Sequence, residues 1–298
     1  MDFFEIFDKL KRKDAALLIF SVLDRIPIIA YGEDSDEIDE FLMDLSTIIH
    51  FRHEFVFYTD FVSKNEIEEL IQNEDIDYNS LRMYIRCPCG VPLKELNQFE
   101  SFSSWIIGRE VSGGKDEINN IKQLVRSKAK VFLNVIFSSG AISLDLEGMR
   151  EKQIDLTLEL NLLQKISQDT EKAVVKMKRV LSEKIKSGDI DKDMIKTLLD
   201  FESEKNEVKK SILKIEIENL HSGSKRAYFI LNRLKLLSDM KITTSIGSKT
   251  LLETIDYEDA PISRIISFIY KEWKEDFSNL IEEGKKVYIG DTIQGLFG

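Results

Sequence analysis

Three short apolar runs in the first third of the chain end in residues that could bind a ligand. The first run ends at Gly32, and four of the next five residues are acids, among which Asp34 is suited to begin a helix. The second run ends at Asp60 and the third at Arg86. If these runs are neighbouring parallel strands, their ends meet at one edge of a sheet, which is where open α/β sheets bind ligands.

A strand that ends in an aspartate, as at Asp60, resembles the Walker B element of P-loop nucleotide hydrolases, whose carboxylate helps to hold Mg²⁺. The acidic first loop does not fit this resemblance, because it lacks the second glycine and the Lys-Ser/Thr pair and would repel phosphate. A later Gly-rich segment places Lys115 as a phosphate contact, but Gly108 and Gly114 are one residue too far apart and Asp116 replaces the hydroxyl. Magnesium with a nucleotide is therefore expected only if one of these segments binds a nucleotide, which is the alternative interpretation. Otherwise both segments are ordinary turns that cap the helices after them.

Two histidines and both cysteines lie within forty residues, at His50, His53, Cys87 and Cys89. Two imidazoles and two thiolates could bind zinc. Parallel strands would oppose such a site, since His53 begins its strand and Cys87 ends the next one, which places them at opposite ends of the sheet. The alternative is that the cysteines are buried free thiols.

A basic region follows in the second half of the chain. Residues 171–249 contain 18 Lys and Arg against 12 Asp and Glu. Lys225, Arg226, Arg233 and Lys235 are the candidate contacts for a nucleic-acid backbone, because affinity for nucleic acid follows the charge of the contacting face. A solvated basic helix face, or one that contacts an acidic partner, is the alternative.

The elements that must position these residues are those of an α/β head at residues 1–146. Apolar runs typical of strands buried on both faces alternate with segments of helical periodicity. The expected sheet is doubly wound and mostly parallel. The predicted strands are 26–31, 55–59, 81–85, 105–107 and 131–136.

From residue 147 onward the periodicity is that of long helices. We expect a helical hairpin at 147–240, followed by a small α-rich C-terminal segment at 241–298. The seam predicted for the first arm consists of Leu156, Leu160, Leu163, Ser167, Thr170, Val174, Met177 and Leu181. The apolar positions predicted for the second arm are Met194, Leu198, Phe201, Val208, Ile212, Ile215, Phe229 and Leu236. A compact helical domain folded onto the head, with a bend at Gly223, is the alternative.

Composition limits the class of protein. The chain has 298 residues, is 43% hydrophobic, carries a net charge of −11 and has only two cysteines, so a disulfide-stapled secreted scaffold is excluded. The sequence has neither a signal peptide nor an apolar run long enough to span a membrane, and a cytoplasmic protein without membrane contact is expected. Because the sequence contains no complete catalytic motif, no catalytic residue is predicted and enzymatic activity stays open. The leading hypothesis is an interaction or regulatory module with a protein partner. The alternatives are a degenerate P-loop-like nucleotide-binding enzyme and a nucleic-acid-associated factor.

Overall fold

A six-stranded sheet forms the centre of the amino-terminal part of the chain. The computed structural model describes residues 6–7, 9–57, 65–66, 69, 83–91, 104–112, 115–138, 141–150, 154–186, 201–242 and 244–286. Within these ranges the sheet has the strand order β2-β3-β4-β1-β5-β6. The strands are β1 (Ile28–Gly32), β2 (His53–Val56), β3 (Met83–Cys87), β4 (Trp105–Glu110), β5 (Phe132–Ser138) and β6 (Ala141–Glu147).

Neighbouring strands of this sheet run in the same direction except at one edge. β1 pairs in parallel with β4 and β5, β3 pairs in parallel with β2 and β4, and β5 and β6 are antiparallel. The register sets Ile28 of β1 opposite Ile106 of β4 and Leu133 of β5. This arrangement confirms the expected α/β class and the mainly parallel sheet.

β6 is a strand that the apolar runs did not predict. Its residues Ile142, Leu144 and Leu146 alternate with polar ones, as in a strand with one face toward the core. Only Leu146 of these three is buried, because β6 lies at the edge of the sheet. A half-buried edge strand has no continuous apolar run, and the alternation was the signal that could have identified it.

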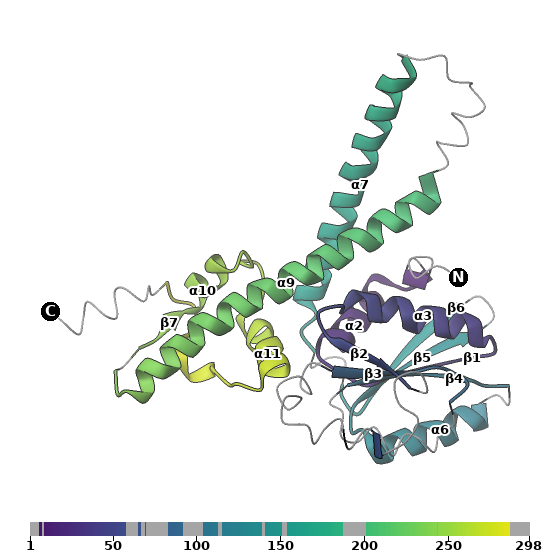
Figure 1. Cartoon of the computed structure of the whole chain (residues 1–298), viewed down its shortest axis with the longest axis horizontal. Helices are drawn as coiled ribbons and strands as arrows, with labels where there is room; N and C mark the ends of the chain where they lie inside the picture. Colours follow the sequence, from purple (N-terminus) through teal and green to yellow (C-terminus); the bar gives the residue numbers. More distant parts are fainter. Residues whose placement is uncertain are drawn as a thin grey trace.

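Helices cover both faces of the sheet (Figure 1). The helices α2 (Arg12–Leu23) and α3 (Ser35–Ile48) pack on one face, and α6 (Lys115–Lys128) packs on the other. Successive residues of a strand point to opposite faces. Accordingly Ile28 and Ala30 of β1 belong to the cluster with α2 and α3, whereas Ile29 and Tyr31 belong to the cluster with α6.

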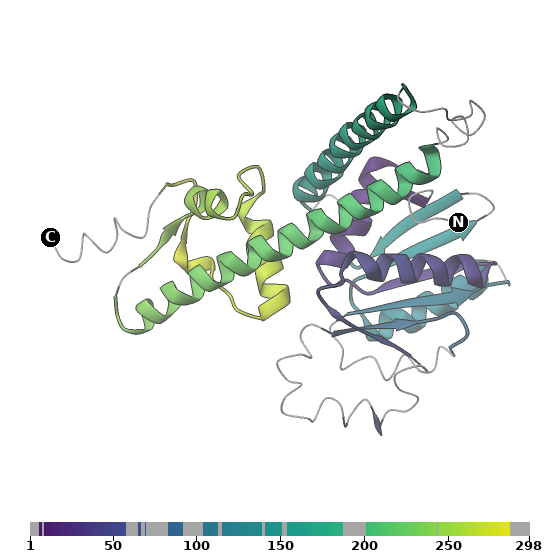
Figure 2. The ribbon, with the colours of Figure 1, turned by 45° about the horizontal axis from the view of Figure 1, so that its top comes forward.

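The long helix α7 (Thr157–Lys186) packs on the head only through its first half. Its buried residues Leu158, Leu162, Ile166 and Thr170 recur every four positions. Of the predicted seam, Thr170 belongs to this stripe, whereas Leu160 and Leu163 are partly buried beside it and Ser167 is exposed. Beyond Thr170, no side chain that the structure describes in α7 is buried. This half of α7 extends away from the head in both views (Figures 1 and 2).

The second long helix, α9 (Phe201–Asp239), continues without a break through Gly223. A Cβ atom at Gly223 would lie 3.1 Å from the carbonyl oxygen of Ile255, so the glycine lets the segment after α10 approach the helix instead of bending it. The buried stripe of α9 is spaced alternately by four and three residues and consists of Leu213, Ile217, Leu220, Ser224, Ala227, Leu231 and Leu234. The predicted positions Ile215, Phe229 and Leu236 are exposed, so the prediction of the buried face was wrong there. Ile212 is partly buried against the core, and Met194 and Leu198 lie outside the described residues.

The remaining described elements surround the carboxyl-terminal half of α9 (Figure 1). They are β7 (Ile246–Gly247), α10 (Ser248–Thr254), α11 (Ile262–Trp273), the 3-10 helix η3 (Ser278–Leu280) and β8 (Ile281–Glu282). No helix within the described ranges is long and apolar enough to cross a membrane.

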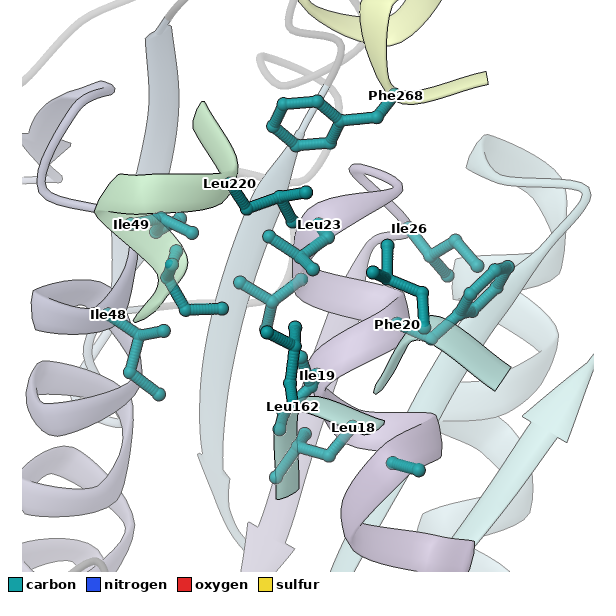
Figure 3. Close-up of a cluster of buried hydrophobic side chains, with 14 of the residues drawn as sticks. Leu18, Ile19, Phe20, Leu23, Ile26, Ile48, Ile49, Leu162, Leu220 and Phe268 are labelled. Atoms are coloured by element: carbon teal, nitrogen blue, oxygen red, sulfur yellow. The ribbon is translucent and has the colours of Figure 1, made fainter. Parts of the chain in front are cut away.

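One hydrophobic core joins the head to the later helices (Figure 3). Leu23 of α2 and Ile48 of α3 meet Leu162 of α7, Leu220 of α9 and Phe268 of α11 in this cluster. Each of these five side chains is at most 5% exposed. The helices after the sheet therefore share the core of the head.

A buried ion network lies beside this core. Glu272 of α11 accepts hydrogen bonds from Arg25 Nη2 at 3.1 Å and from Arg52 Nε at 3.0 Å. All three side chains are at most 2% exposed. Burial by itself would raise the pKa of Glu272, but the guanidinium groups of Arg52 and Arg25 hold it below its ordinary value.

A third buried arginine extends the network to α7. Arg264 of α11 donates to Asp24 Oδ1 at 2.8 Å and to Glu159 Oε1 at 2.9 Å. Burial raises the pKa of Glu159 in spite of the attraction of Arg264. The two networks together fix α11 to the end of α2 and to the start of α7.

Candidate functional site

The sheet has its topological switch point between β1 and β4. The chain leaves β1 through α3 toward the edge strand β2, and it leaves β4 through α6 toward β5, on the opposite side of β1. In open α/β sheets such a reversal opens a crevice at the carboxyl ends of the two strands, where ligands bind. Gly32 and Glu110 are paired in register at this point. The candidate ligand residues Gly32 and Asp34 therefore lie at the expected edge.

The start of α3 at this edge is capped by its own chain. The carboxylate of Asp34 accepts hydrogen bonds from the backbone N–H groups of Asp36 at 3.0 Å and Glu37 at 3.1 Å. A phosphate at a helix start binds such N–H groups. Here they are already bonded to a carboxylate, and two more acids follow in the first turn. This geometry opposes phosphate binding.

Gly32 serves packing at this edge. A Cβ atom at Gly32 would lie 2.9 Å from Cβ of Phe137 and 3.2 Å from Cδ1 of Ile38. The ring of Phe137 also packs edge-on against Phe41, with 5.3 Å between the ring centroids. Aromatic and aliphatic side chains thus occupy the space beside the end of β1.

A thiol lies next to this edge, after β3. The backbone N–H of Cys89 donates to Asp39 Oδ1 at 2.9 Å, and a Cβ atom at Gly108 would lie 2.7 Å from Cys89 Sγ. Burial, followed by the negative charges of Asp39 and Glu110, raises the pKa of the Cys89 thiol. A neutral, 4% exposed thiol is a poor nucleophile, and Cys87 is 2% exposed.

The described part of the structure does not place the other three ligand candidates, Asp60, Lys115 and Arg86, in the crevice. Asp60 lies outside the described residues. Lys115 begins α6, but its side chain lies outside the description. Arg86 donates through Nε to Glu54 Oε1 at 2.5 Å, so its charge is already paired with β2.

The zinc candidates are separated by the parallel pairing of β2 and β3. His53 is in register with Met83 at the start of β3, whereas Cys87 ends that strand. His50 has its Nε2 3.7 Å from a carboxylate oxygen of Glu218. No group of three or more His, Cys, Asp or Glu that could hold a metal ion occurs among the described residues.

Two of the four basic candidates on α9 are paired with acids. Arg226 donates to Asp256 at 2.9 Å, and Lys235 donates to Glu275 at 2.5 Å. Within the described part of the chain, Lys225 and Arg233 have no ion-pair partner. Since phosphate binding depends on unpaired cations, the number of contacts available on this face is halved.

α9 also exposes apolar side chains that the sequence-based prediction of the hairpin expected to be buried. Opposite its buried stripe, α9 exposes a row of residues spaced by three or four positions, which we call the outer stripe: Ile215, Glu218, Ser222, Lys225, Phe229, Arg233, Leu236 and, just beyond the helix, Met240. The apolar side chains Ile215, Phe229, Leu236 and Met240 are 51%, 56%, 56% and 70% exposed. Ile215, Phe229 and Leu236 are separated by multiples of seven residues, and this spacing was the signal in the sequence.

A polar groove of about 1070 Å³ lies beside α9, between α7 and residues 255–260. Its lining includes carboxamides, among them Asn161 and Asn219. Two of its carboxylates are paired across it, Glu216 with Lys165 at 2.6 Å and Asp256 with Arg226 at 2.9 Å. These pairs tie its walls together.

Comparison with known proteins identifies no relative. No protein-family model, no curated protein and no solved structure matches the chain.

Proposed function

We propose that the protein is a cytosolic interaction module in which an α/β head and an α-rich C-terminal segment hold a helical hairpin, α7 and α9, whose outer stripe binds a protein partner. The head acts as a scaffold and carries no catalytic site in this proposal.

The observation that carries the proposal is the outer stripe. The large apolar side chains of Ile215, Phe229 and Leu236 on one face of α9, and of Met240 just beyond the helix, are each at least half exposed. Single exposed apolar residues are common, but a row of them with polar residues at its sides is typical of a surface that binds another protein. The shared core keeps α9 fixed to the rest of the molecule.

The two alternatives have less support. Phosphate binding at the switch point is opposed by the carboxylate of Asp34, which occupies the N–H groups at the start of α3. Nucleic-acid binding has only Lys225 and Arg233 as unpaired candidates on α9 within the described residues, and Phe229 lies between them.

A quantitative affinity capture from source cells tests the proposal. The bait is the full chain or its double variant Phe229→Glu, Leu236→Glu, and the control is Met149→Glu, which introduces one glutamate in place of an apolar side chain at a residue that is 38% exposed outside α9. We expect at least one protein, which can be this chain itself, to be captured by the parent and the control and lost with the double variant.

The variants should fold, because all three positions are exposed. Circular dichroism and the melting temperature check this. Capture of the same proteins by the folded double variant at unchanged yield would overturn the proposal.

A further inference from the structure

We infer that the partner of the outer stripe is a second copy of this chain, bound by antiparallel pairing of the two α9 helices about a two-fold axis. This inference rests on the proposed function and adds the identity of the partner and the register of the contact.

The spacing of the stripe is self-complementary when the second helix is reversed. A register that sets Ile215 opposite Leu236 of the second copy also sets Ser222 opposite Phe229. The small side chain of Ser222 leaves room for the ring of Phe229, as a hole does for a knob in packed helices. Because the contact is isologous, each of these pairs occurs twice.

The same register pairs opposite charges. Glu218 lies three residues after Ile215, and Arg233 lies three residues before Leu236, so the two face each other between copies. Glu218 is 59% exposed, with the imidazole of His50 3.7 Å away. Arg233 is exposed and has no ion-pair partner within the described residues. Parallel pairing would instead set Glu218 against Glu218 and Arg233 against Arg233.

One residue opposes the pairing. Lys225 lies nearest the two-fold axis, where the two copies bring their ammonium groups close together. Neutral Arg226–Asp256 pairs flank this position. Repulsion between the two lysines limits affinity, and their replacement by glutamine should tighten the dimer about threefold.

The contact is long but narrow. From Ile215 to Met240 the stripe extends roughly 38 Å at about 1.5 Å per residue. A single pair of helices buries less surface than most permanent dimers, so we expect a reversible dimer with a dissociation constant in the micromolar range. The core contacts that the head, α7 and α11 make with α9 lie on its buried side and stay unchanged in the dimer, and His50 of the head reaches the edge of the stripe at Glu218.

Sedimentation equilibrium of the full chain from about 1 to 200 µM tests the inference. We expect the mass to rise from the 34.5 kDa of the monomer toward twice that value. Phe229→Glu should weaken association at least tenfold, and Met149→Glu should leave it unchanged. Glu218→Arg and Arg233→Glu should each weaken it several-fold, and the double variant Glu218→Arg, Arg233→Glu should restore it to within about threefold of the parent.

Three outcomes would overturn the inference. They are a parent chain that stays monomeric at 200 µM, a dimer that Phe229→Glu does not weaken, and a charge-exchanged double variant that is as weak as the single ones. A monomeric parent whose captured proteins are still lost with Phe229→Glu, Leu236→Glu would leave the proposed function standing with a different partner. Retained capture by that double variant would refute the proposed function itself.

Discussion

Replacing Glu272 by glutamine should destabilise the chain more than any change of an exposed ion pair. The substitution keeps the shape of the side chain but leaves the charges of Arg25 and Arg52 without their shared carboxylate, in a site where all three are at most 2% exposed. Removal of one partner from a buried ion pair typically costs about 3 to 5 kcal/mol. Arg52 keeps two carbonyl acceptors, Val22 at 2.7 Å and Leu23 at 2.8 Å, which moderate the loss.

Urea unfolding, followed by circular dichroism, measures this loss as a change in the free energy of unfolding. The matched control is Glu275→Gln, which removes the 2.5 Å contact to Lys235 between side chains that are 38% and 42% exposed. An exposed pair of this kind contributes about 1 kcal/mol or less. A loss with Glu272→Gln no larger than the loss with Glu275→Gln would refute the idea that the network fixes α11 to the head.

The pH dependence of the same difference gives a second check. Because the pKa of Glu272 is lowered in the fold, its contribution is complete above the ordinary value of 4.5 and is lost as the pH falls through the lower, folded value. The gap in stability between the parent and Glu272→Gln should therefore be constant near neutral pH and should shrink below about pH 4.5. A gap that widens in acid would contradict this assignment.

Three further predictions concern the head and the turns. Gly148→Ala should lower the free energy of unfolding by well over about 2 kcal/mol, because φ is +82° and the new Cβ would lie 1.8 Å from a backbone oxygen. Gly284→Ala, at φ +71° with no atom within 4 Å, should lower it by about 1 kcal/mol in the same assay. Cys87 and Cys89 should not react with a thiol reagent such as Ellman's in the native chain, and both should react in denaturant; rapid native reaction would show that they are accessible. Asp34→Ala should lower the free energy of unfolding by about 1 kcal/mol through loss of the helix cap. Millimolar ATP or GTP with Mg²⁺ should leave the melting temperature of the parent unchanged, and a clear rise would support the nucleotide alternative instead.

The inner strands of the head were predictable because their burial leaves a direct mark on the sequence. Every residue of β1 is buried, on one face or the other, and gives the continuous apolar run that predicts a parallel strand. The cap of α3 was equally visible, since Asp34 is followed three residues later by Glu37. Both features depend on neighbours in the sequence.

The buried face of α9 was not predictable in the same way. The helix carries two apolar rows with similar spacing, one containing Leu213, Ile217 and Leu220 and the other containing Ile215 and Phe229. Periodicity alone predicts burial equally well for either row. Packing against α7 and α11 decides between them, and that contact joins parts of the chain far apart in sequence.

The ion network and the switch point show the same limit. Arg25 and Glu272 are 247 positions apart, and no local pattern connects them. The position of β4 beside β1 likewise comes from the order of strands in the sheet, which determines where a crevice opens. The sequence could therefore place the predicted site residues at the ends of strands, but it could not identify the residues that they contact in the fold.

The most direct measurement of the central claim is the alkylation rate of a cysteine placed in the middle of the outer stripe. Ser222→Cys provides an exposed thiol in a chain whose native cysteines are buried, and Ser127→Cys on α6 is the exposed control. We predict that Ser222→Cys reacts freely in dilute purified protein and several-fold more slowly in a concentrated extract of source cells, while Ser127→Cys reacts equally in both. Equal rates for Ser222→Cys in the two conditions would contradict the claim that α9 is the binding surface.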